Sequence, residues 1–197
     1  MGNDKYAFCA LLSRMKYIQR WGLMRNTRTE SLSEHVIDVQ LVAHILCLLA
    51  KQDGLQIDEG KVILVSLYHD VSEIVTDDMP SPIKYKREAF RDLYKQMERE
   101  SALNFLDFLP DELVGEVKDY LTGDILTDIE RKIIKSADLI SGMIKCIEEK
   151  QAGNQEFNVA LDRLHKGIVD LDFSPALVFV EKFLPYYYMA LDDLIGR

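Results

Sequence analysis

The sequence predicts an all-α protein that folds as one domain over residues 1–197. Apolar residues recur at the three- and four-residue spacing of amphipathic helices along most of the chain. No segment shows the alternation of polar and apolar residues that marks a half-buried strand. The chain is 48% hydrophobic and 29% charged, and its 197 residues are enough for one well-buried core.

Start signals and apolar spacing give the limits of the expected helices. A first helix is expected at Tyr6–Ile18, and Ser31 and Glu34 have the spacing of a capping box that opens a second. Asp58 is placed to cap a third helix, which should continue until it frays near Thr76. The remaining helices are expected at 88–105, 111–121, 128–151 and 157–169, and from 174 through 188.

The charge balance excludes several partners. With 24 Lys and Arg against 33 Asp and Glu, the net charge is −9, which argues against a surface for nucleic-acid polymers or anionic membranes. Phosphate recognition must then depend on a few clustered arginines, and residues 19–30 hold three beside the only tryptophan. Because no uninterrupted apolar run approaches the roughly 18 residues of a membrane-spanning helix, and three separated cysteines suit reduced thiols, we expect a cytoplasmic protein.

An apolar segment at residues 62–68 leads into three ionisable residues, His69, Asp70 and Glu73. On a continuous helix these side chains lie within about one turn and crowd onto one side. Burying such groups is costly unless they are paired or bind a metal. The pattern therefore predicts a divalent metal site, and a His–Asp pair satisfied within a helical core is the alternative.

Two further residues could complete such a site. His35 falls in the first turn of the second expected helix, and Asp138 lies among inward-facing positions of the 128–151 helix. Two imidazoles and two carboxylates suit an ion such as Mn²⁺, Co²⁺ or Fe²⁺. For Asp138 the alternative is an ion pair with Lys135 or exposure to solvent. His44 lies half a turn away from His35 and is expected in the core or at a helix contact.

In this order, His35, His69-Asp70 and Asp138 resemble the metal-binding signature of the HD-domain phosphohydrolases, an all-helical family. Over nearly the whole chain, the sequence is similar to the small bacterial 5′-deoxynucleotidases of that superfamily. The segments that carry this closer resemblance are Ser13-Arg14-Met15-Lys16, Arg20-Trp21, Leu23-Met24-Arg25-Asn26, Arg28-Thr29-Glu30, Ser33-Glu34-His35, Tyr68-His69-Asp70, Ser72-Glu73, Pro80-Ser81-Pro82-Ile83-Lys84-Tyr85, Lys135-Ser136-Ala137-Asp138 and Lys145-Cys146-Ile147-Glu148-Glu149.

The resemblance implies a single-domain HD helical bundle that hydrolyses deoxyribonucleoside 5′-monophosphates to deoxynucleoside and inorganic phosphate. It implies one divalent metal ion per subunit (Co²⁺, Mn²⁺ or similar), held by His35, His69, Asp70 and Asp138. Both carboxylates are expected to contact the substrate as well. A homodimer is the assembly expected for the family, and the aromatic run Tyr186–Tyr188 could serve either that interface or the core.

Three further residues receive roles from the resemblance. Glu73 is expected to act as the general acid or base, or alternatively to fix His69 by a hydrogen bond. Arg20 is expected to bind the phosphate, with a surface salt bridge as the alternative. Trp21 is expected to face the sugar and leave no room for a 2′-hydroxyl, with a core anchor as the alternative.

The loop after the third helix should complete the sugar site. Asp78 is expected to bind the 3′-hydroxyl, and the alternative is an ordinary solvated loop acid. Asp77 stands where the family pattern has a glycine, so either acid could face the ligand, although the spacing from Glu73 favours Asp78. The wall of the pocket is expected to be Met79, Pro80 and Ser81.

Two other functions remain open. An HD fold could instead hydrolyse a nucleoside triphosphate or a cyclic nucleotide, but a triphosphate pocket should need more clustered Lys or Arg than this acidic chain offers. The site could also belong to a non-catalytic module that only binds metal or nucleotide. The intact candidate ligand set and Glu73 count against that alternative.

Overall fold

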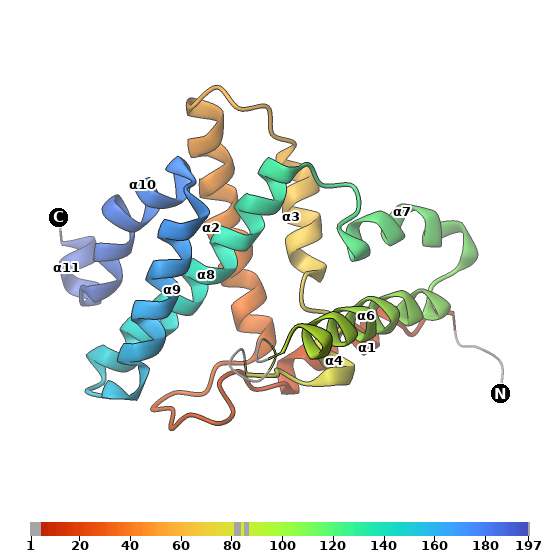
Figure 1. The fold of residues 1–197 in the computed structure, drawn as a ribbon, viewed down its shortest axis with the longest axis horizontal. Coiled ribbons are helices and arrows are strands. Elements are labelled where there is room, and N and C mark those ends of the chain that lie inside the picture. The colour runs from red at the N-terminus through yellow and green to blue at the C-terminus, as the bar shows by residue number, and fades with distance from the viewer. Residues whose placement is uncertain (1–4, 81–83, 85–86, 197) are drawn as a thin grey trace. The chain divides into compact units, whose positions relative to one another are not determined.

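The structure is a computed structural model and describes residues 5–80, 84 and 87–196. Helices joined by turns and loops make up those residues, with one isolated bridge between Gln19 and Ser31 and no extended strand among them, so the all-α prediction is confirmed (Figure 1). In chain order the elements are α1 (Phe8–Leu12), η1 (Ser13–Tyr17), α2 (Leu32–Gln52), α3 (Glu59–Tyr68), α4 (Glu73–Thr76), α6 (Glu88–Asn104), η2 (Phe105–Phe108), α7 (Asp111–Thr122), α8 (Asp128–Gln151), η3 (Gln155–Phe157), α9 (Asn158–Leu171), α10 (Ser174–Lys182), η4 (Leu184–Tyr188) and α11 (Leu191–Ile195).

The chain divides into two compact units. The first comprises Met1–Met24, Thr29–Ile37 and Leu64–Ile125, and the second comprises Arg25–Arg28, Asp38–Ile63 and Leu126–Arg197. Helices α2 and α3 each have residues in both units. The single domain over residues 1–197 therefore stays a prediction.

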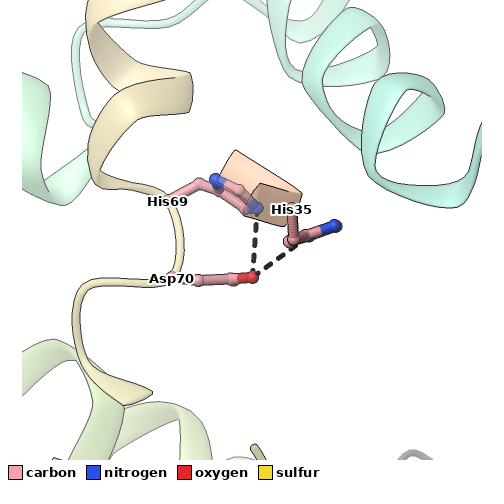
Figure 2. A group of neighbouring side chains, drawn as sticks. All are labelled: His35, His69 and Asp70. Carbon is pink, nitrogen blue, oxygen red and sulfur yellow. Dashed lines mark ion pairs between the residues drawn. The ribbon is translucent and has the colours of Figure 1, made fainter. Parts of the chain in front are cut away.

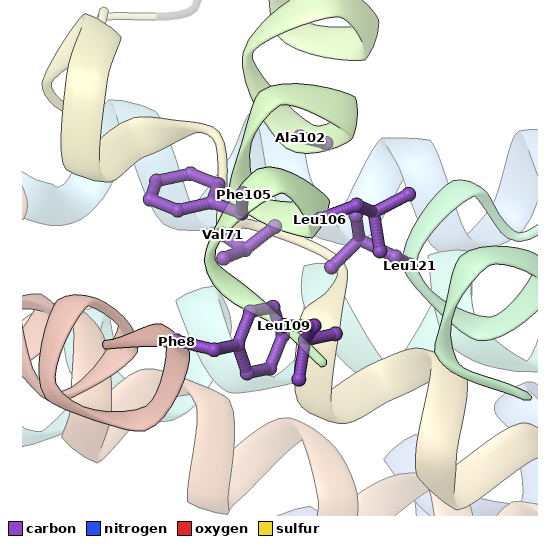
Figure 3. Close-up of a cluster of buried hydrophobic side chains, with 7 residues drawn as sticks. All are labelled: Phe8, Val71, Ala102, Phe105, Leu106, Leu109 and Leu121. Atoms are coloured by element: carbon purple, nitrogen blue, oxygen red, sulfur yellow. The ribbon is translucent and has the colours of Figure 1, made fainter. Parts of the chain in front are cut away.

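Buried apolar side chains from distant segments form a core in the first unit. The cluster contains Phe8, Val71, Ala102, Phe105, Leu106, Leu109 and Leu121 (Figure 3). Val71 is 1% exposed and lies in the turn after α3, directly after Asp70. Fully burying a side chain of this kind is worth about 1.5–3 kcal/mol. This packing therefore anchors the turn that carries His69 and Asp70.

The start of α2 is held by packing and by a cap. Met15, Leu32 and Val36 form a second buried cluster in the first unit. The Ser31 N–H donates to the Glu34 carboxylate at 2.7 Å, and the Glu34 N–H donates to the Ser31 hydroxyl at 3.3 Å. The predicted capping box is thus confirmed, and it fixes the turn in which His35 lies.

The second unit is built on α8, which packs along α9. A capping box of Thr127 and Glu130 opens α8. Asp58 accepts a hydrogen bond from the Lys61 N–H at 3.1 Å, so its predicted role as a cap of α3 is confirmed.

A buried carboxylate near the end of α8 holds the short stretch 25–28. Glu149 is 1% exposed and forms an ion pair with Lys145, which is equally buried. The Thr27 N–H and hydroxyl donate to Glu149 at 2.9 and 2.8 Å, and the Arg28 N–H donates at 3.2 Å. The Asn154 side-chain amide donates to Glu149 at 2.8 Å. These bonds tie the loop to the helix.

Helix α2 is long and apolar enough to cross a membrane, by length and composition alone. The mean hydropathy of its most apolar window is 1.5. Polar residues interrupt the helix, so a search of the sequence for uninterrupted apolar runs does not find it. Val39, Ala43 and Leu46 on this helix are completely buried. A core helix passes the same test, and the finding does not indicate a membrane protein.

The prediction that one helix carries His69, Asp70 and Glu73 is wrong. Helix α3 ends at Tyr68, and α4 begins at Glu73. Between them the Val71 N–H donates to the Tyr68 carbonyl at 3.1 Å, and the Glu73 N–H donates to the Asp70 carbonyl at 3.0 Å. These tight turns accompany the burial of Val71, a tertiary contact that sequence periodicity does not report.

The two ends of the chain also depart from their predicted helices. At the start, the Ser13 hydroxyl donates to the Ala10 carbonyl at 2.8 Å, and the helix divides into α1 and η1. The expected last helix divides into α10, η4 and α11, because Pro185 has no N–H with which to continue an α-helix. The tyrosines at 186–188 are 41–51% exposed, so they are not core residues of this chain.

Candidate active site

Two imidazoles and a carboxylate meet in the first unit. Asp70 Oδ2 lies 3.1 Å from His69 Nε2 and 3.5 Å from His35 Nε2 (Figure 2). One potential ligand atom from each residue lies within 4.8 Å of the other two. His35 comes from the first turn of α2, whereas His69 and Asp70 come from the turn after α3. The structure thus brings together three of the four predicted metal ligands.

The His69 ring is oriented by the last turn of α3. Its Nδ1 lies 2.7 Å from the Ser66 carbonyl oxygen. A carbonyl oxygen only accepts, so Nδ1 is assigned a proton, and Nε2, which faces Asp70, is the nitrogen that would bind a metal once it is deprotonated. Metal-binding histidines in proteins are oriented in this way by the second ring nitrogen.

The charge state of Asp70 also suits a ligand. Burial raises the pKa of Asp70, but the charge of His69 and hydrogen bonds from both imidazoles outweigh burial and hold that pKa well below its usual range. The carboxylate is therefore ionised. Two imidazole nitrogens and one carboxylate oxygen form a donor set that suits a divalent transition-metal ion.

Glu73 is a buried acid beside this cluster. Its side chain lies in the first turn of α4, the residue is 8% exposed, and no hydrogen-bond partner of its Oε2 lies among the described residues. Burial, followed by the negative charges of Asp70 and Asp78, raises the pKa of Glu73 to about 10, against the opposing effect of Arg20 and Lys84. A carboxyl group in this state holds a proton at neutral pH and can donate it.

The loop at residues 19–30 presents Arg20 and Trp21 together. Arg20 Nη1 donates to Glu30 Oε2 at 3.0 Å, and Trp21 Nε1 donates to the same oxygen at 3.2 Å. The Arg20 guanidinium lies 5.8 Å from the centre of the Trp21 ring. The alternative for Arg20 was a surface salt bridge. Arg20 does form a salt bridge, but its partner, Glu30, is a buried carboxylate. Trp21 is half-buried and is not a member of either buried cluster described above.

Asp78 is linked to the same loop. The Trp21 N–H donates to Asp78 Oδ2 at 3.0 Å. Asp77 is exposed and has a left-handed backbone conformation, with φ of 60°. The structure therefore turns Asp78 toward the Trp21 backbone, and which of the two acids faces the ligand stays a prediction. Met79 and Pro80 follow in the half-buried loop, and Ser81 lies outside the described residues.

Asp138 lies on α8, which belongs to the second unit, whereas the other three predicted ligands belong to the first. Its carboxylate accepts from Lys135 Nζ at 2.8 Å, which is the ion pair that the sequence left open. Its neighbour Ala137 is fully buried. The part of Asp138 in the ligand set stays a prediction.

Sequence reasoning gave no site role to two charged residues that the structure places near this cluster. Glu30 accepts hydrogen bonds from both Arg20 and Trp21, and the positive charge of Lys84 lowers the pKa of Glu73. Both belong to segments of the family resemblance, which was their only signal. His44 is exposed, so of its two expected places the core is wrong, and the helix contact stays a prediction.

An all-helical fold that joins a histidine of one helix to a His-Asp pair defines the class of HD-domain phosphohydrolases. The fold is similar to that of an HD-domain phosphohydrolase from Listeria innocua, with a TM-score of 0.81 and 22% identity over 91% of this chain and 87% of that one. It is also similar to the cyanophage S-2L HD phosphohydrolase bound to dA and one catalytic Zn²⁺ ion, with a TM-score of 0.64 and 18% identity over 90% of this chain and 95% of that one.

Sequence comparison defines the family. Residues 7–187 match the model of the YfbR-like 5′-deoxynucleotidases. The chain is 39% identical to a 5′-deoxynucleotidase of Photorhabdus laumondii over 95% of both chains, and 37% identical to one of Klebsiella pneumoniae over 95% of this chain and 94% of that one. The chain therefore belongs to the YfbR-like 5′-deoxynucleotidase family. The predicted resemblance and its enzyme class, a phosphoric monoester hydrolase, are confirmed.

Proposed function

We propose that this 5′-deoxynucleotidase hydrolyses deoxyribonucleoside 5′-monophosphates to deoxynucleoside and inorganic phosphate at the cluster of His35, His69 and Asp70. The observation that carries the proposal is the convergence of this cluster with Glu73, Arg20 and their neighbours in one unit of the chain. The named activity of the relatives and the dA bound to the cyanophage enzyme support the choice of substrate.

One divalent ion per subunit is the proposed cofactor, with Co²⁺ or Mn²⁺ as the first candidates. His35, His69 and Asp70 would hold it, with Asp138 as the proposed fourth ligand. Such an ion supplies positive charge to phosphoryl oxygens and lowers the pKa of water. The donor set and the orientation of His69 by Ser66 support this assignment.

Arg20 and Glu73 are the proposed catalytic residues. The guanidinium offers five N–H donors in a planar fork, which allows Arg20 to serve both Glu30 and a phosphate. The protonated carboxyl of Glu73 would give its proton to the 5′-oxygen as that oxygen leaves phosphorus. Its buried position keeps bulk water from competing for that proton.

The sugar would lie between two loops. Trp21 is proposed to face C2′, where an indole ring excludes a 2′-hydroxyl, and Asp78 is proposed to bind the 3′-hydroxyl. The hydrogen bond between the Trp21 N–H and Asp78 supports a joint role, because it holds the two residues together. Met79, Pro80 and Ser81 are proposed to shape the adjoining wall.

A phosphate-release assay over substrates and metals tests this function. Enzyme stripped with chelator should release no phosphate, and resupply with Co²⁺ or Mn²⁺ should restore release from deoxyadenylate, with much less from adenylate. Deoxyadenosine triphosphate and cyclic adenylate are run beside them with chromatographic analysis of the products, because hydrolysis of the triphosphate chain, or opening of the cyclic ester to adenylate, would favour the alternative HD activities. Bound metal without hydrolysis of any substrate would leave only a binding module.

We also propose a cytoplasmic homodimer. Cys9, Cys47 and Cys146 are all free thiols, as expected in a reducing compartment. On α2, the residues Ile37, Leu41 and Leu48 are 57%, 62% and 40% exposed. Their spacing places them on one face of the helix. An apolar stripe of this kind supports an interface with a second copy of the chain.

A further inference from the structure

Glu30 is a buried acid that serves two side chains of the proposed substrate site. Its side chain is 5% exposed, and that of Arg20 is 12% exposed. Both the guanidinium and the Trp21 indole N–H donate to one oxygen, Oε2, at 3.0 and 3.2 Å. A charged acceptor makes both hydrogen bonds stronger than a neutral one would. One carboxylate therefore holds the Arg20 guanidinium, proposed to bind the phosphate, close to the Trp21 ring, proposed to face the sugar.

The backbone sets the place of Glu30 without help from those side chains. The Arg20 N–H donates to the Glu30 carbonyl at 2.9 Å, and Gln19 and Ser31 form the isolated bridge beside it. The Leu32 N–H then donates to the Ile18 carbonyl at 2.9 Å. The two ends of the loop are thus clamped to each other. The backbone therefore fixes Glu30, and the side chains of Arg20 and Trp21 are held by their hydrogen bonds to it.

The backbone conformation of Trp21 is strained, so tertiary contacts must hold this residue in place. Its φ is 60°, a left-handed conformation that a bulky side chain rarely adopts. Its N–H donates to Asp78 at 3.0 Å, and its carbonyl accepts from the Met24 N–H at 2.9 Å. A strained residue persists only where its surroundings determine it from several sides. The indole bond to Glu30 fixes the ring as well as the backbone.

We propose that Glu30 is a positioning residue that sets the preference for deoxyribose over ribose, by holding the Trp21 ring at the sugar and the Arg20 guanidinium at the phosphate. This inference rests on the proposed function, because that function gives Arg20 and Trp21 their roles. The Trp21 ring can exclude a 2′-hydroxyl only if it is held rigidly in position. Without Glu30, the indole turns aside and the ribonucleotide fits.

Two substitutions of Glu30 separate the effect of its charge from that of its hydrogen bonds. Glu30→Gln keeps one amide oxygen as an acceptor but loses the charge that pairs with Arg20, whereas Glu30→Leu loses both bonds at similar size. We expect kcat/KM for deoxyadenylate to fall about 10- to 100-fold in Glu30→Leu, and the ratio of kcat/KM for deoxyadenylate over adenylate to fall about tenfold. Glu30→Gln should lie between that variant and the wild type. Glu156→Gln is the matched control, since Glu156 is an acid that pairs with Arg25 of the same loop.

Fluorescence gives a readout that needs no catalysis. Trp21 is the only tryptophan of the chain, so its anisotropy decay reports the motion of this one ring. Glu30→Leu should add a fast component that the wild type and Glu156→Gln lack, with helix content unchanged by circular dichroism. If Glu30→Leu does not fold, Glu30→Gln carries the test.

The outcomes distinguish this inference from the proposed function. A wild type that hydrolyses deoxyadenylate, with an unchanged deoxy preference and a rigid indole in the Glu30 variants, would overturn the inference and leave the function intact. A wild type without phosphate release would overturn the function, and fluorescence would still show whether Glu30 holds the ring. A mobile indole with an unchanged substrate ratio would also overturn the inference, since Trp21 would then not set the preference.

Discussion

At the scale of single residues, Glu73 shows how a proposed catalytic group can cost stability. Its pKa is raised to about 10, first by burial, so the folded chain keeps a proton that the unfolded chain releases near pH 4.5. Folding stability from this group is therefore fully present below about pH 4.5 and declines as the pH rises toward 10. In metal-free enzyme at pH 7, the buried acid should lower the free energy of unfolding by on the order of 1–3 kcal/mol.

Glu73→Gln should consequently stabilise the metal-free protein while it lowers turnover. Gln is neutral at every pH, so the melting temperature should rise by about 2–4 °C for each kcal/mol recovered. In metal-loaded enzyme, kcat should fall about 100- to 10,000-fold, with bound metal unchanged by elemental analysis. Calorimetry with chelator compares this variant with Glu116→Gln, which changes an exposed acid on α7. Unaltered turnover would return Glu73 to the role of a supporting hydrogen-bond acceptor.

The individual site residues differ in how far the sequence could predict them. His69 and Asp70 interrupt an apolar segment, so their chemistry was visible from local pattern. Glu30 has no such signal, because its partners lie nine and ten residues away across a loop without period. Its importance follows from the clamp between the loop ends, which is a tertiary feature.

At the scale of elements, the bond between α8 and the stretch 25–28 depends on one carboxylate. Burial raises the pKa of Glu149, but hydrogen bonds from Lys145, Thr27 and Asn154 outweigh burial and lower it to about 2. The stabilisation is present above pH 4.5, the ordinary value, and is lost as the pH falls toward 2. The shift corresponds to about 3 kcal/mol.

Urea unfolding between pH 6 and pH 2 tests this acid dependence. Glu149→Gln should be less stable than the wild type at pH 6, because buried Lys145 then lacks its counter-charge, and the difference should shrink toward pH 2. Glu148→Gln, at the exposed neighbouring position, should follow the wild-type curve. Parallel curves for Glu149→Gln and the wild type would mean that Glu149 does not titrate in this range.

Elements were predicted where local chemistry decides them. The capping box of Ser31 and Glu34 and the starts of α6, α7 and α8 follow from side chains within one turn, and the structure places them within a residue of expectation. The break after Tyr68 accompanies instead the burial of Val71 in a cluster that includes Phe105 and Leu121, which are far away in sequence. For that reason, a prediction from periodicity alone continued α3 past Tyr68 and through Glu73.

At the scale of the whole molecule, α2 carries more apolar surface than this chain covers. Only 44% of its most apolar window is buried, and Ile37, Leu41, His44 and Leu48 form an exposed stripe along one face. Exposed leucines in a row are unfavourable in water unless a partner covers them. The tyrosines at 186–188 are a second exposed group, but their short helical segment offers no continuous face.

Leu41→Glu should therefore dissociate the proposed homodimer. A C2 interface places each residue of the stripe on both sides of the contact, so one substitution puts two carboxylates into apolar surroundings. Light scattering after size exclusion should give the mass of two chains for the wild type and of one chain for Leu41→Glu. Val159→Glu, at a 78% exposed apolar position on α9, is the control and should keep the wild-type mass. A wild type with the mass of one chain would contradict the homodimer, and a dimeric Leu41→Glu would move the interface to another face.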